Sequence, residues 1–394
     1  MTSDVRSHIA LPVIILAQLL GTSLWFSVNG VWLSLSSEQG LSEADLGALT
    51  LAVQLGFIVG TLFLALTGLA DRYKASAIFC FSSLLGASVN ALFIVAADHF
   101  SLAWFLRLLT GLCLAGIYPM GMKLVISWVP KYAGSALSWL LAMLTLGTAL
   151  PHLMRGFTLG LDWHIPLFSA SMLAVLGGIA VGLLGSGPHL PATAKPAALS
   201  QGLSALKQPQ FRAVAGGYFG HCWELYAFWM LIPLLLLAPV SELGWSLSSI
   251  PWLSFSLIGV GALGCICGGW LSKKYGGMSV ARFALITSGT MCLLYPFIIE
   301  LPAWVALFTL TLWGVSVIAD SPQFSALAAQ EAPADKVGSA LAVMNSVGFA
   351  LTIPAIGLVS WSWPFLNEWV AWLLLPGPVL GLWTMRKFDK ISTN

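Results

Sequence analysis

The segment GLADRYKASA, residues 68–77, joins two long apolar segments of this 394-residue chain. It is short, begins with a glycine, and carries Asp71, Arg72 and Lys74. The segment GGWLSKKYGG, residues 268–277, is also short, glycine-led and basic, and it joins two other apolar segments. Two similar joints so far apart in sequence predict a chain built from two related halves.

The composition places both halves in a lipid bilayer. The chain is 58% hydrophobic and only 8% charged, with a mean hydropathy of +0.90, whereas about a quarter of the residues in a soluble domain are charged. About 20 apolar residues cross a bilayer as a helix. Breaks rich in charge, proline or glycine therefore predict an all-α polytopic membrane protein with twelve helical spans, at residues 9–34, 46–70, 75–97, 101–126, 134–159, 163–185, 211–238, 247–272, 281–300, 302–324, 337–361 and 364–385.

The basic residues predict the orientation of these spans. If the N-terminus is inside, every Lys and Arg that lies outside a span falls in an inner loop or tail. The outer loops then carry only acidic charges, which is the pattern expected from the positive-inside rule. We therefore expect an even number of spans, with both termini cytoplasmic, in the inner or plasma membrane.

A four-residue repeat supports the prediction that the chain has two related halves. GSAL occurs at residues 134–137 and again at 338–341, where it begins the fifth and the eleventh predicted span. A shift of six spans relates the two copies. The expected organisation is a six-helix bundle over residues 1–185, a cytoplasmic linker over 186–210 with room for one short surface helix, and a second six-helix bundle over 211–394.

The joint after the second span resembles a hallmark of the major facilitator superfamily, matched here by Gly68, Asp71 and Arg72. In the second half, Ser272 takes the place of the acid. The resemblance implies a transporter that works by alternating access, with Asp71 latching the two halves in the outward-open state. A helix N-terminus near Gly338 would attract this carboxylate. The alternative is that Asp71 and Arg72 are solvated loop charges that only set the topology.

Charged side chains inside a bilayer are costly and usually functional. Arg107 and Gly111 resemble a family motif of the fourth span that is associated with proton coupling; alternatively, Arg107 is a structural arginine near the outer surface. His152 and Arg155 share one face of the fifth span. They are predicted to bind solute, or else to lie at the level of the lipid headgroups.

Two acidic residues lie inside the spans of the second half. Glu224 is in the middle of the seventh span, and His221 lies three residues earlier on the same face, so we expect these two residues to bind the coupling proton. The alternative is a Glu224 held permanently by an arginine such as Arg107. Asp320 in the tenth span and Lys123 in the fourth span are predicted to form a cross-half pair, which would be either a gate or a structural contact.

Neutral and aromatic side chains complete the predicted solute site, namely Trp25, Asn29, Trp223, Gln323 and Asn345. Together with Arg107, His152 and Arg155 they would surround a solute near the bilayer midplane. The surplus of cations over acids predicts a small organic or inorganic anion.

The sequence lacks a phosphate-binding Gly-x-x-x-x-Gly-Lys-Ser/Thr loop, so we expect an ion gradient to drive transport. The leading interpretation is a monomeric, proton-coupled secondary transporter with no cofactor, metal, nucleic-acid partner or catalytic residue. A proton-antiport exporter of amphipathic compounds is the alternative within transport. A non-transporting sensor remains open, whereas an intramembrane enzyme would need a catalytic motif that the sequence does not contain.

Overall fold

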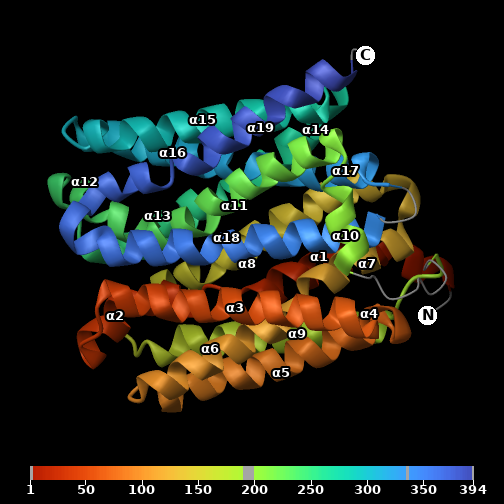
Figure 1. The fold of residues 1–394 in the computed structure, drawn as a ribbon. Helices are drawn as coiled ribbons and strands as arrows, with labels where there is room; N and C mark the ends of the chain where they lie inside the picture. Colours follow the sequence, from red (N-terminus) through yellow and green to blue (C-terminus); the bar gives the residue numbers. More distant parts are fainter. Residues whose placement is uncertain (1–2, 190–198, 334–336, 393–394) are drawn as a thin grey trace. The chain divides into compact units, whose positions relative to one another are not determined.

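The computed structural model describes residues 3–189, 199–333 and 337–392. Every regular element among these residues is a helix (Figure 1). The chain divides into two compact units, of which unit 1 comprises residues 1–42 and 48–196 and unit 2 comprises residues 43–47 and 197–394. Each unit is described below by itself.

The helices from the N-terminal part of the chain are α1 (Ser3–Thr22), α2 (Ser27–Gln39), α3 (Glu43–Thr67), α4 (Leu69–Arg72), α5 (Ala75–Ala96), α6 (Phe100–Ala115), α7 (Tyr118–Trp128), η1 (Pro130–Tyr132), α8 (Ala133–Phe157) and α9 (His164–Leu184). Those from the C-terminal part are α10 (Leu199–Ala205), α11 (Pro209–Leu235), α12 (Leu237–Glu242), η2 (Leu247–Ser249), α13 (Ile250–Gly259), α14 (Gly261–Tyr275), α15 (Gly277–Ile298), α16 (Ala303–Ala319), α17 (Ser321–Glu331), α18 (Val337–Leu366), η3 (Asn367–Leu373) and α19 (Pro376–Ser392).

These helices account for all of the predicted spans. The described residues contain eleven helical stretches that are long and apolar enough to cross a membrane. The last of them, residues 339–386, is 48 residues long and includes α18, η3 and α19. At 1.5 Å per residue it would extend about 72 Å, more than twice the thickness of the hydrocarbon core. The chain turns back at η3, where Asn367 has a positive φ of 48°, so this stretch supplies the eleventh and twelfth spans.

Several spans are broken helices rather than continuous ones. The first span is interrupted at residues 23–26, the fourth at Gly116 and Ile117, and the tenth at Asp320. Pro119 and Pro322 follow the last two breaks at the start of α7 and α17, where a missing N–H is tolerated. The proline of the tenth span predicts its bend, but nothing in the sequence predicts the break in the first span.

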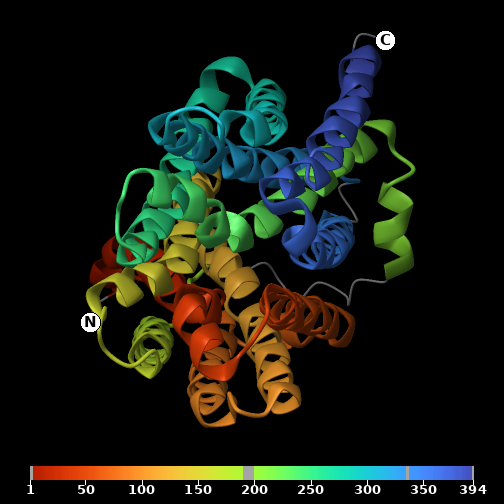
Figure 2. The same cartoon turned by 90° about the vertical axis from the view of Figure 1, so that its left-hand side faces the viewer.

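The two units share one packing scheme, which the end-on view of Figure 2 helps to follow within each unit. In unit 1, α1 packs against α7, α8 and α9. In unit 2, the equivalent α11 packs against α17, α18 and α19. The two GSAL segments fall in matching places, because α8 begins at Ala133 and the described part of α18 begins at Val337.

Glycines at equivalent positions let helices approach closely in both units. Gly56 of α3 lies against the carbonyl of Leu108 on α6, and Gly264 of α14 lies against the carbonyl of Val315 on α16. A Cβ atom at either glycine would overlap with that carbonyl oxygen. Small residues at such contacts drive helix association in lipid, where the hydrophobic effect contributes little.

A glycine with a positive φ follows the helix at each of the two basic joints. Gly68 follows α3 with a φ of 64°, and Gly276 follows α14 with a φ of 83°. Only glycine adopts such backbone angles at low cost. Asp71 lies in the short helix α4 that follows Gly68, whereas Ser272 lies near the end of α14, before Gly276.

Candidate functional site

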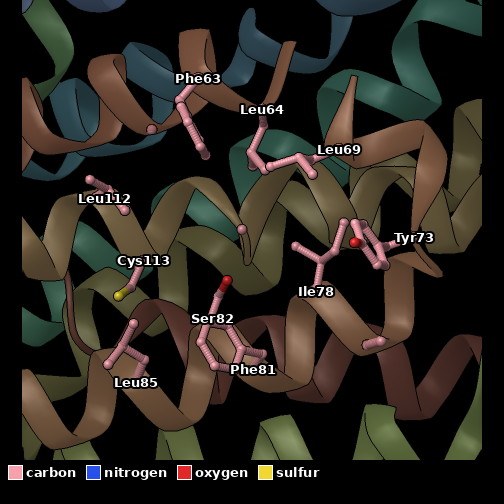
Figure 3. Close-up of a pocket in the computed structure, with 13 residues that line it drawn as sticks. Phe63, Leu64, Leu69, Tyr73, Ile78, Phe81, Ser82, Leu85, Leu112 and Cys113 are labelled. Atoms are coloured by element: carbon pink, nitrogen blue, oxygen red, sulfur yellow. The ribbon is translucent and has the colours of Figure 1, made fainter. Parts of the chain in front are cut away.

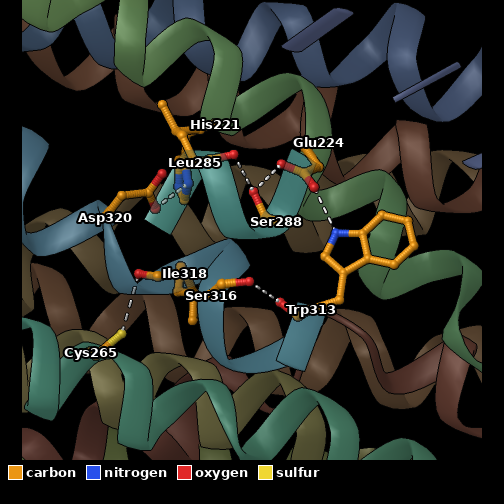
Figure 4. A network of polar contacts seen from close by, with 9 residues as sticks. All are labelled: His221, Glu224, Cys265, Leu285, Ser288, Trp313, Ser316, Ile318 and Asp320. Carbon is orange, nitrogen blue, oxygen red and sulfur yellow. Dashed lines mark hydrogen bonds and ion pairs between the residues drawn. The ribbon is translucent and has the colours of Figure 1, made fainter. Parts of the chain in front are cut away.

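Glu224 lies at a three-helix junction inside unit 2. Its side chain on α11 is 1% exposed. One carboxylate oxygen accepts a 2.6 Å hydrogen bond from the indole N–H of Trp313 on α16, and the other accepts a 2.9 Å bond from the hydroxyl of Ser288 on α15 (Figure 4). Both donors are neutral, so they orient the carboxylate without supplying a compensating positive charge.

Aromatic packing fixes the position of the Trp313 donor. The Trp313 ring is fully buried and stacks on Phe228 with ring centroids 4.4 Å apart. Tyr295 packs on its other side at 6.1 Å and donates its hydroxyl to the Leu235 carbonyl at 2.8 Å. An indole held this firmly presents its N–H at one place, and that place is the Glu224 carboxylate.

The partner of His221 is Asp320. The Nδ1 atom of His221 lies 2.7 Å from Oδ1 of Asp320, and both side chains are at most 2% exposed. The sequence paired His221 with Glu224, and Asp320 with Lys123. The structure instead places His221 against Asp320 at the α16–α17 break (Figure 4), because residues three apart on α11 can point to different neighbouring helices.

Arg107 on α6 is a buried charged residue inside unit 1. Its guanidinium donates to the carbonyls of Leu24 and Trp25 at 3.3 and 2.6 Å, and to the side chains of Ser27 and Asn90 at 3.0 and 3.1 Å. The two carbonyls belong to the break between α1 and α2. In the bilayer core such freed carbonyls need a partner inside the protein, and Arg107 supplies it. These partners are all neutral and all within unit 1.

The residues of the predicted latch divide between the two units. Lys123 of α7 donates a hydrogen bond to the carbonyl of Ala70 in α4, the short helix that carries Asp71 and Arg72. The backbone of α4 is described, whereas the Asp71 side chain lies outside the described residues; Arg72 is exposed. Lys123 therefore braces the joint after the second span from within unit 1.

The two basic residues of the fifth span have different environments. His152 is 2% exposed, and its Nε2 atom has no hydrogen-bond partner among the described residues. Arg155 is partly exposed and donates to the Ser34 hydroxyl at 2.6 Å and to the Leu161 carbonyl at 3.0 Å. Arg155 thus ties the end of α8 to α2 and to the loop that follows α8.

The neutral residues predicted in the first span are buried in unit 1. The amide nitrogen of Asn29 donates to the Thr50 hydroxyl of α3 at 3.0 Å. The Trp25 ring lies in the break before α2 and contacts Phe57 of α3 with ring centroids 4.9 Å apart. Both side chains are at most 4% exposed.

Two buried amides beside them were missed by sequence reasoning. Gln18 on α1 and Gln54 on α3 are fully buried, and neither amide oxygen nor nitrogen has a partner among the described residues. The signal available in the sequence was a lone glutamine in the middle of an otherwise apolar span. This signal is weaker than that of a charged residue, because a neutral amide is less costly to bury than a charge.

The neutral residues predicted in the second half do not form one group. Trp223 is half-buried, donates to the Leu373 carbonyl at 2.9 Å, and lines a groove of about 330 Å³ between α11 and α19. Gln323 is buried and its amide nitrogen has no partner among the described residues. Asn345 is half-buried on α18.

A larger groove of about 440 Å³ lies between α3, α5 and α6 of unit 1 (Figure 3). Its lining is apolar apart from the hydroxyls of Tyr73 and Ser82. No residue of the predicted solute site lines it. The candidate functional residues are therefore the buried polar side chains rather than this apolar surface.

Comparison with known proteins accounts for this combination of a twofold helical repeat and buried polar side chains. The family model described as Major Facilitator Superfamily matches residues 14–356. This chain belongs to the major facilitator superfamily. It is thus an integral, multi-pass membrane protein of a transporter family and has a small molecule as its substrate.

Solved structures of the superfamily show the same fold. Two of them are crystal structures of a bacterial homologue of the human lysosomal transporter Spinster, in inward-facing unoccupied and inward-facing occupied conformations. They are 14% and 13% identical to this chain, with TM-scores of 0.69 and 0.71. The alignments cover 100% of this chain and 96% and 98% of the other. No curated protein matches the sequence. At this low identity the likeness concerns the fold alone.

Proposed function

We propose that this transporter is coupled to protons and that unit 2 carries them on Glu224 and on the His221–Asp320 pair. The observation that supports this most is the hydrogen bonding of Glu224 by an indole and a hydroxyl alone. A carboxylate inside a bilayer needs a compensating charge. Because its hydrogen-bond donors are neutral, a proton is the charge that can arrive and leave during a transport cycle.

The His221–Asp320 pair is the second proton-binding element of the proposal. An imidazole and a carboxylate 2.7 Å apart can share one proton and release it when their separation changes. Asp320 lies at the break between α16 and α17, where a small change in helix angle would alter that separation. Other titratable side chains near these groups include the thiols of Cys222 and Cys292 and the phenol of Tyr218, whose ring stacks on His221 with centroids 5.9 Å apart.

Flux in liposomes under an imposed pH gradient tests the proposal. The solute is first found by screening compounds for stabilisation of the purified protein. We expect Glu224→Gln to abolish the acceleration by the gradient while retaining solute exchange, since the amide is permanently neutral. Glu300→Gln, at an exposed position of unit 2, is the matched control. A Glu224→Gln variant that responds to the gradient as the wild type does would overturn the proposal.

The same measurement separates symport from antiport. A symporter moves solute toward the alkaline side, whereas an antiporter moves it toward the acidic side. The second outcome would favour the exporter alternative. Neither result depends on which solute is used.

We also propose that the protein lies in the inner or plasma membrane as a monomer with both termini cytoplasmic. The distribution of Lys and Arg supports this orientation. Within it, Lys123 holds the joint that carries Asp71 and Arg72 at the inner face, so that Asp71 can act as the latch. Reporter fusions at residue 394 that place the C-terminus outside would contradict the orientation.

A further inference from the structure

The chemical class of the solute can be inferred from which buried polar groups already have hydrogen-bond partners in the structure. The sequence favoured an anion because cations outnumber acids inside the spans. In the structure, Arg107 and Lys123 donate to backbone carbonyls, and Arg155 donates to a hydroxyl and to carbonyls. All three cations therefore already hydrogen-bond to neutral groups within unit 1.

Other buried polar atoms have no hydrogen-bond partner. Among the described residues of unit 1 they include both amide atoms of Gln18 and of Gln54, Nε2 of His152, the Ser83 hydroxyl and the Nε atom of Arg107. All of these side chains are at most 2% exposed. An unpaired polar group in such surroundings costs free energy. Proteins retain such groups where a ligand satisfies them, because stability is often traded for function at binding sites.

Helix contacts relate two of these groups to the segment of α2 that carries Asn29. Gln54 lies on α3 between Thr50, which accepts from Asn29, and Phe57, whose ring contacts Trp25. Gly30, the residue after Asn29, packs directly against Pro151, the residue before His152 on α8. Gln54 therefore lies between two α3 residues that contact this segment, and His152 lies next to the α8 residue that contacts it.

Gln18 and Thr22 lie one turn apart on α1, before the break at residues 23–26, and Asn29 lies after the break on α2. We call the buried polar side chains of this broken span, together with Gln54 and His152, the polar stripe. The side-chain oxygen of Gln18 lies beside Gly121 of α7, and Thr22, one turn later, lies beside Gly147 of α8. The stripe is thus bordered by α3, α7 and α8, all within unit 1.

We propose that this stripe binds an uncharged, polar solute through Gln18, Gln54 and His152, with hydroxyl or amide groups that both donate and accept hydrogen bonds. An amide side chain offers one acceptor oxygen and two N–H donors, which matches such a solute better than an anion, which only accepts. The inference rests on the proposed transport function and specifies its substrate class.

Binding to the purified full-length protein tests the class directly. The melting temperature is measured with uncharged probes (glycerol, glucose, urea, nicotinamide and uracil) and with anionic probes (acetate, lactate, nitrate and phosphate). We expect at least one uncharged probe to raise the melting temperature. Glycerol and glucose test recognition of hydroxyl groups, and urea, nicotinamide and uracil test recognition of amide groups. A panel in which only anions stabilise, or in which no uncharged probe does, contradicts the proposal.

Substitution of the amides supplies a second readout that needs no ligand. Because each amide is unpaired, Gln54→Leu and Gln18→Leu should raise the melting temperature of the free protein by about 2–4 °C. They should also weaken binding of the stabilising probe about tenfold or more. Gln208→Leu makes the same change at an exposed position and should do neither.

The result that would overturn the assignment is a lower melting temperature in Gln54→Leu and Gln18→Leu, since the amides would then be structural. Equally, an unchanged affinity for the probe in both variants would show that Gln18 and Gln54 do not bind the solute. These measurements need no proton gradient, so their failure leaves the coupling role of Glu224 untouched, and the flux test of Glu224→Gln stands independently.

Discussion

The indole N–H of Trp313 on α16 donates a 2.6 Å hydrogen bond to the carboxylate of Glu224 on α11. The two residues are 89 positions apart in sequence. Their contact gives unit 2 a buried acid with a defined orientation and neutral donors. Unit 1 has a buried arginine, Arg107 on α6, which donates to carbonyls of a broken helix. The repeat therefore provides one packing scheme, and the two halves carry different buried charged residues at different positions within it.

Removing the acceptor at Glu224 should destabilise unit 2. Glu224→Ala leaves the Trp313 indole and the Ser288 hydroxyl without their partner, and each unpaired buried donor costs about 1–3 kcal/mol. Glu224→Gln keeps one acceptor oxygen, so we expect it to lose less than the alanine variant does. Denaturant titration of the purified variants in detergent measures both. Equal stability of the alanine variant and the wild type would show that these hydrogen bonds contribute nothing.

Arg107 should matter for folding rather than for solute recognition. Arg107→Ala removes the donors to two carbonyls at the α1–α2 break, for an expected loss of about 3 kcal/mol or more. Arg155→Ala, at a partly exposed position, should lose far less. Thermal unfolding and the yield of monodisperse protein compare the two. An Arg107→Ala variant that is as stable as the wild type but no longer binds the solute would contradict this prediction. It would show that Arg107 takes part in solute binding.

The paired glycines should respond alike if the two units are true repeats. Gly56→Val and Gly264→Val each place a Cβ into a backbone carbonyl on the facing helix, and overpacking of this kind costs about 1–3 kcal/mol or more. Both variants should lower the melting temperature by similar amounts. Ala350→Leu, at an exposed position of α18, is the control for added volume. Damage from only one of the two glycine substitutions would argue against equivalent packing.

A surface acid gives a pH-dependent local contact. The backbone N–H of His164 donates to Asp162 at 3.0 Å, and this bond is the main reason why the pKa of Asp162 lies below its usual value of 3.8. A lowered folded-state pKa means that the stabilisation is present above about pH 3.8 and is lost as the pH falls through the folded value. The protection factor for hydrogen exchange in the first turn of α9, which corrects for the intrinsic pH dependence of exchange, should therefore fall at acidic pH. Asp162→Asn should reduce that pH dependence; an unchanged profile would exclude Asp162 as its source.

Much of the architecture was predictable from sequence because the bilayer allows few solutions. Twelve apolar spans, the clean charge asymmetry and the repeated GSAL segments all follow from the demands of spanning and packing in lipid. The joint at Gly68 was recognisable for the same reason.

The side-chain partners were not predictable in the same way. His221 and Glu224 share a helix face by spacing, yet they bond to Asp320 on one side and to Trp313 and Ser288 on the other. Such choices depend on which helices are neighbours and how far each is rotated. The break at residues 23–26 was invisible in an unbroken apolar run, so the structural role of Arg107 could not be derived from the sequence.

The most direct test of proton binding needs no solute. Infrared titration of the protein in lipid nanodiscs follows the C=O band of protonated carboxyl groups from mildly acidic to mildly alkaline pH. The account predicts a titrating band of which one component is lost in Glu224→Gln and another in Asp320→Asn, while Glu300→Gln retains both. A band that does not titrate, or one that both variants leave unchanged, would contradict proton binding at these two acids.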